Sequence, residues 1–77
     1  MHELALTEQI LSTIEARLGD ARIVRVRLRI GRLAAVLPDA LRFAFEVCSE
    51  ATPMAGARLE IDEVSGDELT IQEVEVA

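Results

Sequence analysis

From Arg22 to Arg32 the chain alternates between apolar and charged side chains. In an extended chain the apolar residues of this run share one face: Val24, Val26, Leu28 and Ile30. The charged residues share the opposite face: Arg25, Arg27 and Arg29. A period of two is typical of a β-strand that is buried on one face and solvated on the other. The run therefore predicts a sheet that is covered on one side, with Gly31 weakening the end of this strand.

A helix is predicted on each side of this strand. The first spans Leu4 to Leu18, and Gly19 follows as a left-handed C-cap. Its expected inward residues are Leu4, Ile10, Leu11, Ile14 and Leu18. The second helix begins at Pro38, which suits a first helical turn, and stops before the Thr52-Pro53 step. Its expected inner stripe is Leu41, Ala44, Phe45 and Cys48, with Phe43 and Val47 beside it.

Two more strands are predicted in the last third of the chain. Residues 58–64 place Leu59 and Ile61 on the inner face, and residues 68–76 form the other strand. The apolar parity of this last strand shifts by one residue near Gln72-Glu73. Such a shift is produced by a β-bulge, or by a strand end that changes its covered face. Between the two strands, Gly66-Asp67 favours a tight type II′ hairpin turn.

These elements predict an α/β fold, a two-layer sandwich with two helices packed on one face of a three-stranded mixed sheet, in the order α-β-α-β-β. Residues 1–77 are expected to form a single domain, because a chain of this length leaves no room for a second. The helix between the first two strands allows them to be parallel, and the hairpin would make the last two antiparallel neighbours.

Composition and charge exclude several classes of function. A formal net charge of −6 argues against nucleic-acid binding, which needs a basic surface. No apolar run approaches the ~20 residues that span a membrane, and a lone cysteine suits a reducing compartment, so we expect a soluble cytoplasmic protein. One histidine, His2, and one inward-facing cysteine, Cys48, give no base–nucleophile pair, so no enzyme is expected.

The three arginines of the alternating strand allow two interpretations. They could form a recognition surface, or they could pair with acidic residues of neighbouring strands. We favour pairing, because the other two strands are rich in outward carboxylates: Glu60 and Asp62 on one, Glu73 and Glu75 on the other.

The first three residues, Met1, His2 and Glu3, are candidate metal ligands. The α-amine of Met1 and the peptide nitrogen of His2 close a five-membered chelate ring, and this nitrogen and His2 Nδ1 close a six-membered one. The fourth place in the plane is open to the Glu3 peptide nitrogen, its carboxylate, water or another residue. Planar, nitrogen-rich sites suit Ni(II) and Cu(II) better than Zn(II). The competing interpretation is a solvated chain end without metal.

Four segments together resemble the HypA/HybF family of hydrogenase nickel-insertion proteins: MHELALTEQIL, VRLRIGRLAAVLPDALRFAFEV, GARLEI and SGDELTIQEVEVA. The resemblance implies a Ni(II) metallochaperone that works with a nickel-handling GTPase (HypB) and the large subunit of [NiFe]-hydrogenase. In some bacteria such proteins also serve urease. The nickel ligands of the family carry over to Met1, His2 and Glu3. The alternative is an interaction module of the maturation machinery that binds no metal.

The sequence also departs from the family. Members carry a zinc domain with two Cys-x-x-Cys pairs between the last two strands, whereas Val64 leads directly to Ser65 here, and no zinc is expected. A shortened hinge at this point favours a domain-swapped homodimer as an alternative to the monomer. Leu37 stands where the family often has an acidic residue, so an auxiliary carboxylate is missing, and Asp39 falls on the following helical turn.

Overall fold

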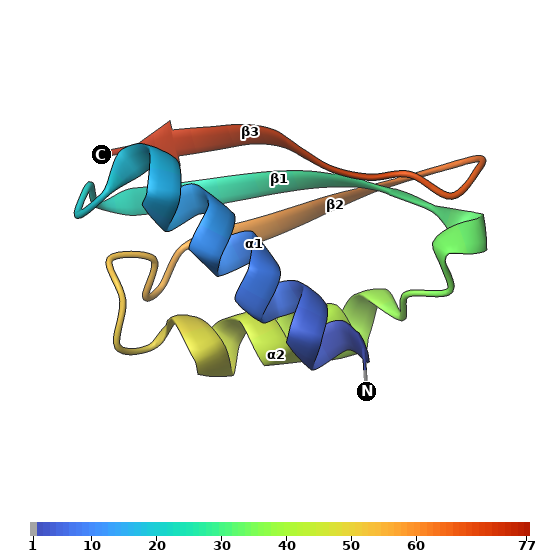
Figure 1. The fold of residues 1–77 in the computed structure, drawn as a ribbon, viewed down its shortest axis with the longest axis horizontal. Helices are drawn as coiled ribbons and strands as arrows, with labels where there is room; N and C mark the ends of the chain where they lie inside the picture. The colour runs from blue at the N-terminus through green and yellow to red at the C-terminus, as the bar shows by residue number, and fades with distance from the viewer. Residues whose placement is uncertain (1) are drawn as a thin grey trace.

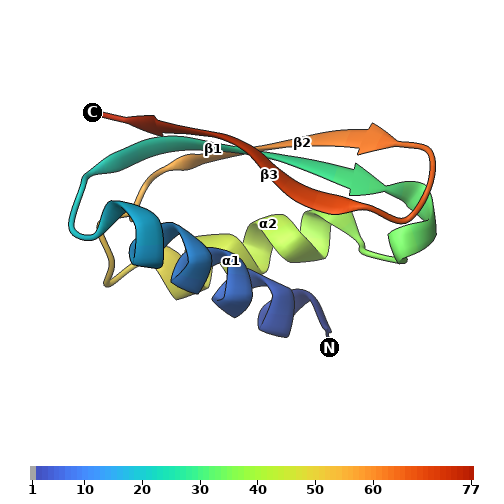
Figure 2. The ribbon, with the colours of Figure 1, turned by 45° about the horizontal axis from the view of Figure 1, so that its top comes forward.

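The computed structural model describes residues 2–77, and it confirms the predicted two-layer α/β sandwich. The elements follow one another as α1 (His2–Leu18), β1 (Ile23–Gly31), a 3₁₀ turn η1 (Arg32–Ala34), α2 (Pro38–Ser49), β2 (Arg58–Val64) and β3 (Leu69–Val76). Both helices lie on the same side of the three-stranded sheet (Figures 1 and 2). None of these helices is long and apolar enough to cross a membrane.

Helix α1 begins two residues earlier than predicted and buries only its middle turns. Ile10, Leu11 and Ile14 are buried in the core, as expected. Leu4 and Leu18 were expected inward, but they are 43% and 37% exposed. A row of residues spaced by seven drifts around a straight helix by about 20° per step, and α1 crosses the sheet diagonally (Figure 1), so both ends of this row leave the core. Gly19, at φ +58°, ends the helix as predicted.

Helix α2 packs as its sequence predicts. Leu41, Ala44 and Phe45 are buried, and Cys48 packs against the core while remaining partly exposed. Phe43 and Val47 are 68% and 49% exposed, so they lie outside the inner stripe. The helix ends at Ser49, before the Thr52-Pro53 step.

The start of β1 corrects the predicted inward set. Ile23 pairs with Val76 and Arg25 pairs with Glu75, so Val24 is an extra residue without an opposite partner. This irregularity turns Val24 outward, where it is 39% exposed, and places Ile23 in the core at 1% exposure. From Val26 to Ile30 the predicted alternation holds.

The order of the strands is β2-β1-β3, so the predicted hairpin between the last two strands is wrong. Strand β1 lies between them, parallel to β2 and antiparallel to β3. Charge explains this order. Direct pairing of β2 with β3 would set Glu60 and Asp62 against Glu73 and Glu75, and like charges on paired strands are destabilising.

The turn from β2 to β3 therefore crosses the end of β1. Residues 65–68 make this crossing, with Gly66 at φ +95°, a conformation that favours glycine. The backbone N–H of Gly31 donates to the carbonyl of Glu68 at 2.7 Å, and that of Leu33 donates to Gly66 at 2.8 Å. A Cβ atom on Gly31 would lie 2.2 Å from the carbonyl oxygen of Gly66, so the crossing requires glycine here.

The parity shift predicted in the last strand is confirmed as a register shift between β1 and β3. Arg27 pairs with Glu73 and Leu28 pairs with Ile71, so Gln72 is the extra residue. Beyond it Val74 packs against the core, while Glu73 and Glu75 reach the outer face of the sheet.

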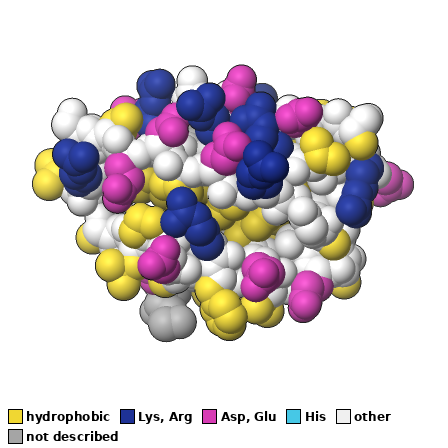
Figure 3. Space-filling view, turned by 180° about the vertical axis from the view of Figure 1, so that it is seen from behind, with side chains coloured by type: hydrophobic (Ala, Val, Ile, Leu, Met, Phe, Trp, Pro, Cys, Tyr) yellow, Lys and Arg dark blue, Asp and Glu magenta, His cyan; other side chains and the backbone are white. Residues whose placement is uncertain are grey.

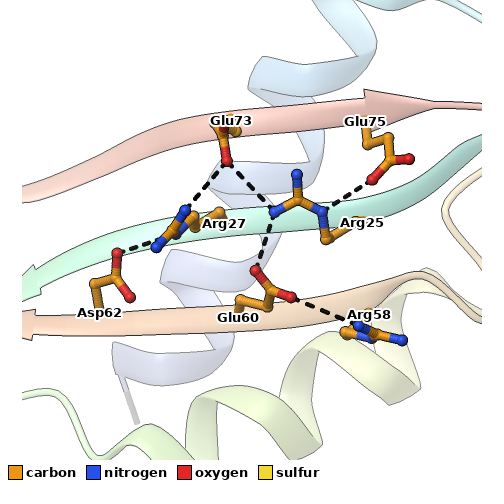
Figure 4. A network of polar contacts seen from close by, with 7 residues as sticks. All are labelled: Arg25, Arg27, Arg58, Glu60, Asp62, Glu73 and Glu75. Carbon is orange, nitrogen blue, oxygen red and sulfur yellow. Dashed lines mark hydrogen bonds and ion pairs between the residues drawn. The ribbon is translucent and has the colours of Figure 1, made fainter.

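On that outer face Arg25 and Arg27 pair with acidic residues from both neighbouring strands (Figure 4), which confirms the pairing interpretation for two of the three arginines. Arg29 forms no ion pair with the described residues. We call this network the arginine ladder; its members are Arg25, Arg27, Glu60, Asp62, Glu73 and Glu75. Arg25 contacts Glu75 at 2.9 Å and Glu60 at 3.0 Å, and Arg27 contacts Asp62 at 3.0 Å. Glu73 accepts from both arginines at 3.4 Å.

The two arginines and four carboxylates of the ladder sum to a formal charge of −2, so the ladder is acidic overall. Hydrogen bonds from Arg25 to Glu75 and Glu60 raise the pKa of Arg25, and those from Arg27 to Asp62 raise the pKa of Arg27. Seen from behind, the molecule likewise shows basic and acidic side chains intermixed along its upper part, above a hollow with hydrophobic side chains (Figure 3). Such a mixed surface is typical of internal pairing.

Candidate metal centre

The candidate site lies where α1 begins, beside the start of α2. In Figure 1 the first turn of α1 lies close to the first turn of α2. Met1 lies outside the described residues, so the predicted amine ligand has no described position. His2 and Glu3 form the first turn of α1. The predicted pair of side chains is therefore brought together on a helix, which gives it a fixed backbone.

The Glu3 side chain ties this turn to the segment that precedes α2. Its Oε2 atom accepts a hydrogen bond from the backbone N–H of Leu37 at 3.1 Å, and the side chain is 12% exposed. Leu37 is the N-cap of α2 and has no polar side chain with which to cap the helix, and Pro38 has no N–H. The Glu3 carboxylate, which belongs to α1, therefore accepts a backbone hydrogen bond immediately before α2 begins.

The hydrogen bond to Leu37 also fixes the charge of Glu3. It is the largest cause that lowers the pKa of this carboxyl, followed by a hydrogen bond from the backbone N–H of Glu3 itself. Burial acts in the opposite direction, and the neighbouring His2 lowers the pKa further. Glu3 is thus a carboxylate at neutral pH.

His2 presents its imidazole to solvent next to this carboxylate. The side chain is 54% exposed, and Nε2 lies 3.7 Å from Glu3 Oε2. A carboxylate near one ring nitrogen favours the proton on that nitrogen and leaves the lone pair of the other available. The other ring nitrogen, Nδ1, is the atom that can close a chelate ring with the His2 peptide nitrogen.

The backbone N–H groups at the start of α1 make no hydrogen bonds to carbonyl groups within the helix. His2 and Glu3 belong to the first turn, where N–H groups have no carbonyl acceptor four residues earlier in the helix. Replacing such an amide proton by a metal ion breaks no helical hydrogen bond. Within residues 2–77 no three His, Cys, Asp or Glu side chains gather into a group that could hold a metal ion.

Sequence reasoning missed the contact between Glu3 and Leu37. One signal was available: a proline at the first position of a helix preceded by Leu37, a residue that cannot cap it. Asp39, in contrast, lies in the first turn of α2 as expected, where it is fully exposed and contacts Arg42 at 3.4 Å.

Comparison with known proteins identifies the family to which this chain belongs. The family model described as "Hydrogenase/urease nickel incorporation, metallochaperone, hypA" matches residues 1–69. Among curated proteins, the hydrogenase maturation factor HypA of Chloroflexus aurantiacus is 51% identical over 67 residues, which cover 83% of this chain and 59% of that protein. HypA of Trichormus variabilis is 44% identical over 66 residues, which cover 86% of this chain and 58% of that protein. The chain thus spans less than two thirds of the length of these relatives.

A solved structure has the same fold. The solution structure of the Ni metallochaperone HypA from Helicobacter pylori matches with a TM-score of 0.69, over 97% of this chain and 86% of that one, at 18% sequence identity. At this identity the match concerns the fold alone, whereas the family model and the curated relatives rest on the sequence itself. The chain belongs to the HypA family of nickel metallochaperones.

Proposed function

We propose that this chain is a Ni(II)-binding metallochaperone domain that assists nickel insertion into [NiFe]-hydrogenase. In the proposal, Ni(II) is cargo held by the α-amine of Met1, by the peptide nitrogen and Nδ1 of His2, and by Glu3. The observation that carries it is the placement of the His2 imidazole beside the Glu3 carboxylate, on a helical turn whose amide nitrogens lack carbonyl acceptors within the helix.

The contact with Leu37 favours one of the open choices for the fourth ligand. Because the Glu3 carboxylate already accepts the Leu37 N–H at 3.1 Å, we take the peptide nitrogen of Glu3 as the fourth donor, which would give up the hydrogen bond to its own carboxylate. The carboxylate then holds the turn in place and sits near His2 Nε2. Carboxylates commonly orient metal-bound imidazoles in this way.

The exposure of the site suits delivery. His2 is more than half exposed, so the ligands of a receiving protein can replace the donors of this chain one at a time. We propose the nickel-handling GTPase (HypB) and the hydrogenase large subunit as partners, with urease maturation as a second destination. No zinc takes part, because the zinc domain of the family is proposed to be missing between Val64 and Ser65, where residues 65–68 lead directly from β2 to β3.

The test is a Ni(II) titration of the untagged chain that starts at Met1. We expect a yellow d–d absorption band near neutral pH that fades on acidification, because protons compete for the ligands. The substitution His2→Ala should weaken binding by at least roughly 100-fold, more than the loss of a group that only orients a ligand. Two residues added before Met1 should have the same effect, because they move the amine away.

Matched controls identify the cause. Glu8→Ala removes an exposed carboxylate from the same helix, and a two-residue extension at Ala77 lengthens the other end of the chain. Neither should change nickel affinity. If the untagged chain ignores nickel at mildly alkaline pH, the delivery proposal is wrong, and the alternative stands: an interaction module that binds no metal.

A further inference from the structure

A groove runs between α1 and β3, away from the candidate metal centre. Its volume is about 720 Å³. Its apolar lining comes from four residues of α1 and three of β3: Leu6, Ile10, Ile14, Leu18, Leu69, Ile71 and Val74. The lined stretches, residues 6–18 of the helix and 69–74 of the strand, each correspond to about 17–18 Å. An extended segment of about six residues has this length.

The strand beside the groove has a free edge. β3 pairs with β1 on one side, and no other strand of residues 2–77 pairs with its second side. The opposite edge strand, β2, differs because α2 packs against it, and the hollow between α2 and β2 is only about 240 Å³. Unpaired N–H and C=O groups along an edge form a template for one more strand.

The arginine ladder indicates the charge of such a strand. Across the outer face of the sheet, the strands alternate from acidic β2 to basic β1 to acidic β3. Glu73 and Glu75 are 50% and 55% exposed, compared with 34% for Glu60. Each of the two β3 carboxylates uses only its Oε1 atom in contacts with the described residues, so its other oxygen can accept hydrogen bonds from a fourth strand.

We propose that the groove between α1 and β3, with the free edge of β3, docks an extended segment of a partner protein whose residues alternate between apolar and basic. The apolar side chains of this segment enter the groove, its backbone pairs with β3, and its basic side chains meet Glu73 and Glu75. This is strand addition with the charge pattern that β1 already shows inside the sheet. The proposal concerns a surface separate from the nickel ligands.

A second copy of this chain fits the same edge poorly. Pairing of β3 with another β3 would bring Glu73 and Glu75 close to the same glutamates of the other chain, which is destabilising. The bulge at Gln72 also disturbs the regular ladder that such pairing needs. The complementary occupant is therefore basic, and it comes from another protein.

The experiment uses the full chain and a synthetic peptide, acetyl-Thr-Arg-Val-Arg-Val-Arg-Val-Thr-amide. In NMR titrations we expect amide shifts along β3 and along α1 from Leu6 to Leu18. Two further peptides carry N-methyl groups on either the arginines or the valines. Because alternate N–H groups of a strand point to opposite edges, one methylated peptide should keep its affinity and the other should lose it. Equal affinities of these two peptides would overturn the proposal.

Charge variants test whether Glu73 and Glu75 bind the basic side chains of the segment. The double change Glu73→Gln with Glu75→Gln should weaken peptide binding about tenfold. Glu8→Gln with Glu15→Gln alters the net charge equally on the outer face of α1, outside the groove lining, and should leave the affinity within about twofold. Equal losses in both variants, shifts confined to β2, or β3 shifts that grow with protein concentration alone would overturn the proposal. If a variant fails to fold, the NMR titrations of the unaltered chain with the three peptides still test the proposal.

Discussion

The arginine ladder and two backbone ties hold distant segments together in different ways. In the ladder, two arginines share four carboxylates, and Glu73 serves both arginines (Figure 4). The ties have no such redundancy. Glu3 is the side chain that bonds the Leu37 N–H, and Gly31 is the residue that allows the turn at Gly66 to pass over β1. We therefore expect substitutions in the ladder to reduce stability less than substitutions that break either backbone tie.

The largest effect is expected at Gly31. Gly31→Ala places a methyl group 2.2 Å from the Gly66 carbonyl oxygen, so the turn must move and its hydrogen bonds weaken. We expect the free energy of unfolding to fall by roughly 2–3 kcal/mol, as in overpacked cores. Chemical denaturation measures it. The control is Gly19→Ala, where φ is +58° but no atom lies within 4 Å, and the loss should stay near 1 kcal/mol. Equal losses would show that the close approach is not limiting.

A smaller, local effect is expected at Glu3. Its pKa lies below the ordinary value of 4.5, so its contribution to stability is complete above that pH and is lost as pH falls through the lowered pKa. The Leu37 amide proton should report this titration by NMR, with a midpoint below 4.5. Glu3→Gln should abolish the titration and speed hydrogen exchange at Leu37. A Leu37 titration that survives the substitution would assign it to another carboxylate.

The smallest effect is expected in the ladder itself. Arg27→Gln removes contacts with Asp62 and Glu73, but Arg25 keeps Glu73 paired. The denaturation midpoint should move less than in Gly19→Ala, and the difference should vanish as salt rises from 0.1 to 1 M, which shortens the screening length from about 10 to about 3 Å. Arg29→Gln is the control, because Arg29 has no ion pair with the described residues. A large, salt-independent loss in Arg27→Gln would contradict the proposed redundancy.

Much of the fold could be predicted from the sequence because strand and helix periods are local. The alternation after Arg25, the stripe around Leu41 and the parity shift at Gln72 each predict where a side chain lies. The order of the strands was predicted wrongly, because the Gly66-Asp67 signal is local and a hairpin is the commonest use of such a turn. The charges of the three strands do predict the observed order, because a basic strand is most stable between two acidic ones.

For the candidate site, the sequence predicted the ligand atoms but not the contacts that hold them in place. Met1, His2 and Glu3 are adjacent in the sequence, so their chelate geometry follows from covalent structure. The tie from Glu3 to Leu37 joins residues 34 positions apart and ends on a backbone N–H. The Leu37-Pro38 step signals only that α2 lacks a side-chain cap of its own. It does not identify Glu3 as the partner, because any residue except proline has a backbone N–H donor.

The crossing of β1 by residues 65–68 has a consequence for the zinc domain that we propose to be missing at this turn. Because β2 and β3 leave the sheet on opposite sides of β1, the two ends of an inserted domain would be fixed about 10 Å apart. Two separated attachment points define an axis, so an attached domain would rock about that axis, and its free rotation would be restrained.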